Sequence, residues 1–285
     1  MIPGAFDYYA PRSLGDAVKY LSAHKDDVKI LSGGQSLLPL MKMRLSKPAY
    51  VLDIGRIDGL DRIAQEGNSL ILGALVTHNQ IEDSALLKAQ CPLLPQTATT
   101  IADVQVRNRG TIGGSVAHAD PAGDVPAAIV ALEAEIKITG PNGERWVKCD
   151  DFFLGLLMSV LEPDEVVTAV KVPVTGADKT AYLKAAPRSS GFAVVGVAVR
   201  LTMDAQGICS RAVVAITGVS DKAYRPERTE QILSGKKLET MVIQQAAAEA
   251  TRNIEVIEDI NGSAEYRKHL TEVYVERAIQ EALAG

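Results

Sequence analysis

The chain has few of the residues that build disulfide frameworks and metal centres. It contains three cysteines and four histidines among 285 residues. The cysteines, Cys91, Cys149 and Cys209, lie about sixty residues apart, so no pair has the close spacing of a zinc or iron–sulfur site. An odd count also argues against a disulfide framework. No two histidines form an HxxxH or similar pair, and we therefore expect three buried or idle thiols and no metal site.

Long apolar runs and an excess of positive charge are missing as well. No segment approaches the ~18 consecutive apolar residues that a membrane span needs. The N-terminal MIPGAFDYYAPRS lacks the charged and apolar regions of a secretory signal. A net charge of −5 does not suit a nucleic-acid surface. We expect a cytoplasmic protein with no nucleic-acid partner.

The composition that remains is that of a globular protein, with 47% hydrophobic and 23% charged residues. The length suits one large domain or two to three smaller ones. Hydrophobic patterning in the first part predicts alternating strands and helices. The strands fall at residues 28–31, 50–54, 69–76 and 164–174, with a hairpin over 134–148 and a helix over 93–104.

Two further helix starts carry capping-box signatures. Ser13 precedes a helical pattern and is followed three residues later by Asp16, and Thr77 stands in the same relation to Gln80. Residues 106–115 are interpreted as a loop.

The pattern changes near Gly176. Residues 180–186, 192–203 and 210–219 read as strands, and helices are predicted over roughly 239–252 and 264–283. Strands followed by helices favour an antiparallel sheet covered on one face. We expect a domain boundary at this point.

Two short glycine segments stand out. The first is Ser32-Gly33-Gly34-Gln35-Ser36, directly after a strand, and the second is Thr111-Ile112-Gly113-Gly114-Ser115. Paired glycines let backbone amides approach an anion, and successive amides form an anion-binding nest. Either segment alone is more simply explained as a tight turn, but two of them, ~80 residues apart, could clamp one diphosphate. Neither is a G-x-G-x-x-G or a P-loop motif.

Two aspartates follow the second segment in a stretch rich in glycine and proline. Asp120 and Asp124 could accept hydrogens from ribose hydroxyls or an adenine amine. Asp120 is more simply a turn cap. Asp124 also suits a helix start, with Pro126 in the first turn.

Taken together, these motifs resemble the FAD-binding (medium) subunits of the molybdenum hydroxylases, of the carbon monoxide dehydrogenase and xanthine dehydrogenase type. The resemblance covers essentially the full chain, in order and at family spacing. It is carried by residues 6–11 (FDYYAP), 33–37 (GGQSL), 105–115 (QVRNRGTIGGS), 119–121 (ADP), 124–127 (DVPA) and 184–188 (KAAPR).

The resemblance implies an α+β fold. Residues 1–175 would form a vanillyl-alcohol-oxidase (PCMH)-type FAD-binding domain of two α+β subdomains, about 1–57 and 58–175. Residues 176–285 would form a C-terminal domain of antiparallel sheet and helices.

The resemblance also implies a set of FAD contacts. Ser32, Gly33, Gly34, Gln35 and Ser36 would wrap the diphosphate by backbone amides, and Thr111, Gly113, Gly114 and Ser115 would form a second cradle. Some relatives carry Asn or Asp where this chain has Ser115. The remaining implied contacts are His118, on the same loop as the second segment and facing the cofactor, Asp124 on the ribityl or ribose hydroxyls, Ile101, Val167 and Phe192 near the flavin ring, and Lys184 at its pyrimidine edge.

By the same resemblance, the chain is one part of an oxidoreductase. It would take electrons from a [2Fe-2S] small subunit, while a molybdopterin-containing large subunit oxidises the substrate. It would pass them through FAD to NAD, a quinone or O2. The complex would be a dimer of heterotrimers, cytoplasmic or peripheral at the inner membrane. No catalytic acid, base or nucleophile is expected in this chain. A self-contained flavoenzyme of a related FAD fold and a non-catalytic nucleotide-binding scaffold are the alternatives.

Overall fold

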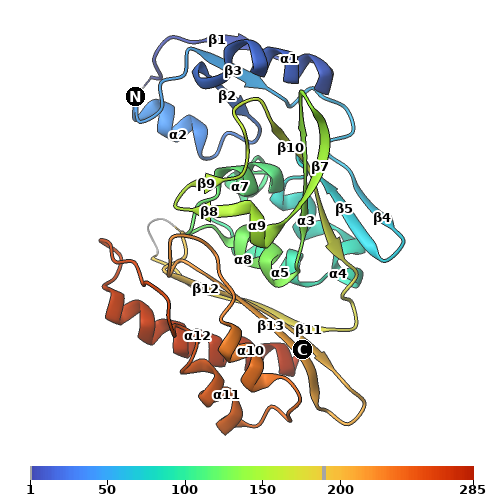
Figure 1. The fold of residues 1–285 in the computed structure, drawn as a ribbon, viewed down its shortest axis with the longest axis vertical. Coiled ribbons are helices and arrows are strands. Elements are labelled where there is room, and N and C mark those ends of the chain that lie inside the picture. Colours follow the sequence, from blue (N-terminus) through green and yellow to red (C-terminus); the bar gives the residue numbers. More distant parts are fainter. Residues whose placement is uncertain (1, 188–190) are drawn as a thin grey trace.

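The structure is a computed structural model that describes residues 2–187 and 191–285. Its elements form three bodies stacked along the long axis, each built around a sheet (Figure 1). Arg188, the last residue of the 184–188 motif, lies outside the described residues.

The first body is a small parallel sheet with helices beside it. The strand order is β1-β3-β2, and both pairings are parallel. Ser13 caps α1 as expected, because its hydroxyl accepts the Asp16 amide. The elements are β1 (Asp7–Tyr9), α1 (Leu14–His24), η1 (Lys25–Asp27), β2 (Val28–Leu31), α2 (Leu37–Lys42) and β3 (Tyr50–Asp53).

The second body centres on an antiparallel sheet of order β4-β5-β10-β6-β7. Its strands are β4 (Ile63–Glu66), β5 (Ser69–Gly73), β6 (Glu135–Gly140), β7 (Gly143–Lys148) and β10 (Val166–Pro173). The predicted strand 69–76 stops early, at Gly73. The strand ends there because of a tertiary contact. The carbonyls of Ala74 and Val76 accept hydrogen bonds from amides of the segment around residue 112 and not from a neighbouring strand.

Short helices lie beside this second sheet and between it and the sheet of the third body. They are α3 (His78–Asp83), α4 (Ala85–Gln90), α5 (Leu93–Thr99), α6 (Val104–Arg107), α7 (Ile112–His118), α8 (Asp124–Ala131) and α9 (Cys149–Phe152). The Thr77–Gln80 capping box is present at α3. The interpretation of residues 106–115 as a loop was wrong, since α6 and α7 occupy most of it.

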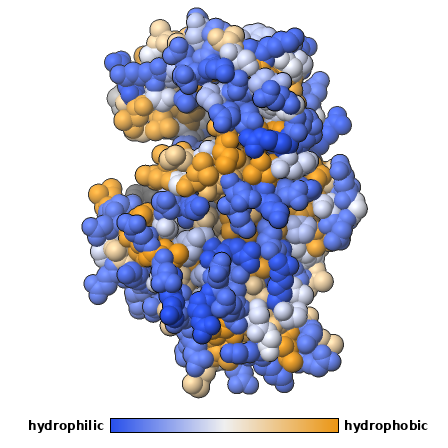
Figure 2. All heavy atoms as spheres, in the orientation of Figure 1, coloured by the Kyte–Doolittle hydropathy of each residue, from blue (hydrophilic) through white to orange (hydrophobic). Residues whose placement is uncertain are grey.

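A small hairpin, β8 (Phe153–Gly155) and β9 (Met158–Ser159), leaves the second body and exposes its apolar side chains. Leu154, Leu156, Leu157 and Met158 are all more than half exposed. Figure 2 shows hydrophobic surface gathered at the level where the first body meets the second.

The third body is an antiparallel sheet of order β11-β12-β13 with helices packed along it, as the sequence predicts. Its elements are β11 (Lys179–Ala185), β12 (Val195–Met203), β13 (Cys209–Thr217), α10 (Glu227–Leu233), α11 (Thr240–Ala247) and α12 (Ala264–Ala284). The apolar faces of the sheet and of α11 and α12 share one core. Arg267 of α12 is almost fully buried, donates to the carbonyls of Val194 and Gly218, and is paired with Asp259.

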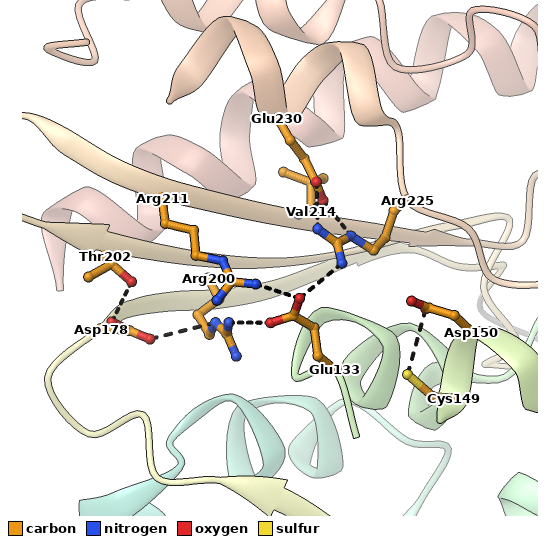
Figure 3. A network of polar contacts seen from close by, with 10 residues as sticks. All are labelled: Glu133, Cys149, Asp150, Asp178, Arg200, Thr202, Arg211, Val214, Arg225 and Glu230. Atoms are coloured by element: carbon orange, nitrogen blue, oxygen red, sulfur yellow. Dashed lines mark hydrogen bonds and ion pairs between the residues drawn. The ribbon is translucent and has the colours of Figure 1, made fainter. Parts of the chain in front are cut away.

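An ionic network joins the third body to the C-terminal end of α8 (Figure 3). Glu133 binds Arg200 at 2.8 Å, Arg211 at 2.5 Å and Arg225 at 3.2 Å. Burial opposes the charged carboxylate, but the three guanidinium groups outweigh it and hold the pKa of Glu133 below its usual value. Arg225 also pairs with Glu230 at 2.7 Å. The network therefore fixes α8 against the third sheet.

The three cysteines are buried thiols, as expected. Within residues 2–187 and 191–285, no helix is both long enough and apolar enough to cross a membrane. The longest helix, α12, has 21 residues and contains charged residues along its whole length.

Candidate functional site

A cavity of about 520 Å³ lies between the first and second bodies, a volume within the usual range for small-molecule sites. Both glycine segments line it, although they are far apart in the sequence. The predicted site residues that line this cavity are Ser32, Gly33, Gly34, Gln35, Ser36, Ile101, Thr111, Gly113, Gly114, Ser115, His118, Asp124, Val167 and Phe192. Lys184 is the predicted residue that does not line it.

The first glycine segment, residues 32–36, connects β2 to α2. Gly34 has φ +76, a left-handed conformation that favours glycine. Gly33 has a different constraint, because a Cβ there would lie 2.0 Å from the Arg109 carbonyl oxygen. None of the described residues accepts the amides of residues 33–36. Four successive amide donors therefore stand available at the cavity wall, as an anion-binding nest requires.

The second glycine segment, residues 111–115, is the first turn of α7 and not a loop. Thr111 is the N-cap, and its hydroxyl accepts the Gly114 amide at 3.1 Å. The amides of Ile112 and Gly113 donate to Val76 and Ala74, and that of Ser115 donates to Thr111. The protein itself therefore satisfies the amides of residues 112–115. What the second segment still offers the cavity is its side-chain hydroxyls.

The second segment's glycines serve packing. A Cβ on Gly113 would lie 2.4 Å from the Cβ of Ala74 and 2.7 Å from its backbone. A Cβ on Gly114 would lie 2.9 Å from the Thr111 hydroxyl that caps the helix. Gly113 thus lets α7 approach the end of β5 closely, and its missing side chain faces the protein.

Hydrogen bonds connect the two segments to each other and to a buried histidine. Ser32 Oγ and Thr111 Oγ1 are 2.8 Å apart, so one hydroxyl donates to the other. Ser115 Oγ lies 3.2 Å from Nε2 of His78, the first residue of α3. His78 is not among the predicted site residues, because a single histidine after an N-cap carries no signal of its own.

Asp124 begins α8, as predicted, and its carboxylate is paired within the protein. Tyr182 donates a hydrogen bond to Oδ1 at 2.5 Å, and Lys184 lies 2.9 Å from Oδ2. Burial raises the pKa of Asp124, while Lys184 and Tyr182 act against that rise. Lys184 also donates to the Gly191 carbonyl at 2.7 Å. Both partners come from β11, so the third body positions a residue of the cavity.

The preceding turn is held in the same way. Asp120 accepts the Ala122 amide at 2.9 Å and thus caps its own turn, as the simpler interpretation predicted. The Thr217 hydroxyl of β13 donates to the Pro121 and Gly123 carbonyls. His118 ends α7 and was wrongly assigned to a loop; its Nε2 lies 3.9 Å from Asp120.

Apolar side chains complete the cavity wall. Val167 is buried in β10 beside a register shift, and Ile101 is partly buried before α6. Leu157 at the tip of the β8–β9 hairpin and Leu161 also line the cavity. Leu157 has φ +54, unusual for a bulky residue. A cavity with polar donors in one region and apolar residues in another suits a ligand that has one polar part and one apolar part.

Comparison with known proteins identifies that ligand. The sequence profile described as "FAD binding domain in molybdopterin dehydrogenase" matches residues 4–175, and "CO dehydrogenase flavoprotein C-terminal domain" matches residues 180–282. The chain belongs to the family of FAD-binding medium subunits of molybdenum hydroxylases, of the carbon monoxide dehydrogenase type. It is an oxidoreductase subunit, and its cofactor is FAD.

Individual relatives match over the full length. The carbon monoxide dehydrogenase medium chain of Hydrogenophaga pseudoflava is 40% identical over 100% of this chain and 99% of its own. The 6-hydroxypseudooxynicotine dehydrogenase complex subunit alpha of Paenarthrobacter nicotinovorans is 35% identical over 99% and 96%. A solved chain of carbon monoxide dehydrogenase from Hydrogenophaga pseudoflava, lacking the Mo-pyranopterin moiety, superposes with a TM-score of 0.96, at 41% identity and 100% and 99% coverage. The fold is therefore that of these medium subunits.

The residues present fit the cofactor. A diphosphate needs several donors on one wall, and the amides of residues 33–36 and the Ser115 hydroxyl supply neutral ones. An isoalloxazine ring needs a flat apolar environment, which Ile101, Val167 and Leu161 can provide. The structure alone therefore supports the cofactor that the family carries.

Proposed function

We propose that this chain passes electrons from the [2Fe-2S] clusters of a partner subunit, through its FAD, to an external acceptor. The acceptor would be NAD, a quinone or O2. A molybdopterin-containing large subunit and a [2Fe-2S] small subunit would be its partners, in a dimer of heterotrimers. The complex would work in the cytoplasm or at the inner membrane. When bound, FAD supplies the redox chemistry, and the protein orients it and tunes its potential.

One observation carries this proposal. The four amides of residues 33–36 face the same cavity as the apolar residues of β10 and of residue 101. That arrangement binds a diphosphate at one wall and leaves apolar surface for a ring. We assign the diphosphate to Ser32–Ser36, with Thr111, Gly113, Gly114 and Ser115 as the adjoining part of the wall. Ile101, Val167 and Phe192 would surround the ring.

Asp124 and Lys184 take a joint role in this proposal. Lys184 lies outside the cavity lining and reaches it through Asp124. It therefore keeps a buried carboxylate compensated beside the cofactor. His118 would face the cofactor at the cavity surface, where its imidazole is partly exposed.

The domain division is proposed on the same basis. Residues 1–175, with subdomains of about 1–57 and 58–175, would hold the cofactor between them. Residues 176–285 would form the domain that fixes Asp124 and Glu133, the two ends of the α8 region, through β11, β12 and β13.

The test compares the chain purified alone with the chain purified with the subunits that accompany it. Bound flavin, seen as absorption near ~450 nm that persists through gel filtration, is expected in the complex. Iron and molybdenum should co-purify. After anaerobic reduction with dithionite and its removal, NAD, a quinone and O2 are added separately, and the acceptor is the one that reoxidises both flavin and iron.

Two outcomes contradict the proposal. A flavin-containing chain that turns over a substrate without iron or molybdenum partners would be a self-contained flavoenzyme. A complex without flavin would support a nucleotide-binding scaffold. Lys184→Met should shift the flavin potential of the complex and also lower its melting temperature, because the Asp124 carboxylate would stay buried without its ion pair. An unchanged potential would remove Lys184 from the site.

A further inference from the structure

His78 occupies a position that no cofactor-binding motif of the chain accounts for. Its side chain is 3% exposed, yet it lines the cavity behind the second glycine segment. Its backbone amide donates to the Gly110 carbonyl at 3.0 Å. Gly110 must be a glycine for this packing, since a Cβ there would lie 2.8 Å from the imidazole Cδ2. The chain therefore makes room for an imidazole directly beneath Ser115.

The imidazole is neutral. Burial lowers the pKa of His78 to about 4, and the guanidinium of Arg107 acts in the same direction. Arg107 is itself paired with Glu82 at 2.8 Å, which fixes the position of its guanidinium. A neutral ring carries a hydrogen on one nitrogen and a lone pair on the other.

The hydrogen-bond partners indicate which nitrogen carries the hydrogen. Nε2 lies 3.2 Å from Ser115 Oγ, whereas Nδ1 is buried without a partner among the described residues. A buried N–H without an acceptor is rarer in proteins than an unused acceptor lone pair. The favoured tautomer therefore has its hydrogen on Nε2, pointing at the serine.

We propose that His78 is a positioning residue of the FAD site: it donates to Ser115 Oγ and so directs the serine's own hydrogen into the cavity, toward a diphosphate oxygen. The amides of residues 112–115 are already used inside the protein, so this hydroxyl is a polar donor that α7 still offers. Without the imidazole, the hydroxyl can turn back onto the Thr111 carbonyl four residues earlier, as serines in helices do. The proposal rests on the assignment of the diphosphate to this cavity.

A double-mutant cycle on the full chain tests this role. FAD is titrated into the apo form of wild type, His78→Phe, Ser115→Ala and the double variant, and Kd is read from flavin fluorescence. Each single change should weaken FAD binding about fivefold to tenfold, the value of one hydrogen bond. The double variant should be no weaker than Ser115→Ala. His78→Gln, which keeps a donor, should recover part of the affinity.

The matched control is His24→Phe. His24 packs among Tyr20 and Tyr50 and does not line the cavity. Its replacement should leave Kd unchanged. Multiplicative losses in the double variant, or a change below twofold in His78→Phe, would overturn the proposal.

A second measurement is independent of FAD and of the folding of any variant. The ¹⁵N chemical shifts of the His78 ring in the wild-type apo chain report which nitrogen carries the hydrogen. Hydrogen on Nε2 is expected, and hydrogen on Nδ1 would refute the proposed donor role. If the tautomer is as expected but wild type binds no FAD in the complete complex, the cavity assignment fails instead.

Discussion

The two glycine segments look alike in sequence but differ in backbone conformation, hydrogen bonding and burial. In the first, Gly34 takes a left-handed conformation, and four successive amides are left for a ligand. In the second, Gly113 adopts ordinary helical geometry and its hydrogen faces Ala74. The first segment is partly exposed, whereas much of the second is buried. Similar pairs of glycines thus leave backbone amides without a protein acceptor in one place and allow close helix–strand packing in the other.

The largest expected effect is that of Gly113→Val. The new side chain would meet the Ala74 backbone, which cannot yield without separating α7 from β5. We expect a loss of about 3 kcal/mol or more, as in severe overpacking. The measurement is denaturant unfolding of the apo chain, so that stability is separated from FAD binding.

Gly15 is the matched control for Gly113. Each is the second residue of a helix capped by Ser or Thr, but a Cβ on Gly15 would have no atom closer than 4.0 Å. Gly15→Ala should be neutral or stabilising by up to ~1 kcal/mol, and Gly113→Ala should destabilise. Equal effects of the two alanine substitutions would remove the packing role.

The second segment should also respond to acid through His78. Its folded pKa of about 4 lies below the ordinary 6.5, so the unfolded chain binds the proton first. Stability from this group is therefore complete above pH 6.5 and is lost as pH falls toward 4. The loss should reach roughly 2 kcal/mol at pH 5. Unfolding of wild type and His78→Phe at pH 7 and pH 5 checks this, and parallel losses in both would contradict it.

Gly34→Ala tests the first segment. A left-handed alanine costs about 1–2 kcal/mol, and the cost falls on the loop that carries the donors. We expect that loss of stability together with weaker FAD binding, measured as Kd. Gly235→Ala is the control, because Gly235 has φ +77 in open space in the third body. Gly235→Ala should lose a similar amount of stability with the Kd for FAD unchanged. A changed Kd in this control variant would mean that the assay reports stability alone.

The smallest effect concerns the bond that joins the segments. Ser32→Ala removes the hydroxyl 2.8 Å from Thr111 and should cost about 1 kcal/mol. Thr111→Val removes this bond and the helix cap as well, and should cost about 2 kcal/mol. Unfolding measurements on both variants separate the two contributions, and equal losses would show that the cap contributes nothing.

Local signals in the sequence were sufficient for much of the fold. The helix caps at Ser13 and Thr77 depend only on three or four neighbouring residues, and both caps are present. The strands over 28–31 and 210–219 follow from short runs of mainly apolar residues. The start of α8 at Asp124 depends on a turn followed by proline in the first helical turn, which is again local.

Residues 111–118 form a capped helix, although local signals predicted a loop for the first part of it. Two adjacent glycines disfavour a helix by intrinsic propensity, so a loop was the natural prediction. The helix forms because Ala74 and Val76 accept its first amides and because Thr111 caps it. Ala74 and Val76 lie more than thirty residues before the helix in the sequence, so the periodicity of the helical segment cannot reveal them.

Residue patterns along the chain were enough to predict the family, the cofactor, most of the strands and both glycine segments of the cavity wall. Tertiary structure alone decided which amides are available, that Asp124 is paired with Tyr182 and Lys184, and that His78 lies beneath Ser115. The physical reason is the range of the interactions. Caps, turns and apolar runs are settled between near neighbours, whereas the satisfaction of a buried polar group depends on whichever distant segment the fold brings against it.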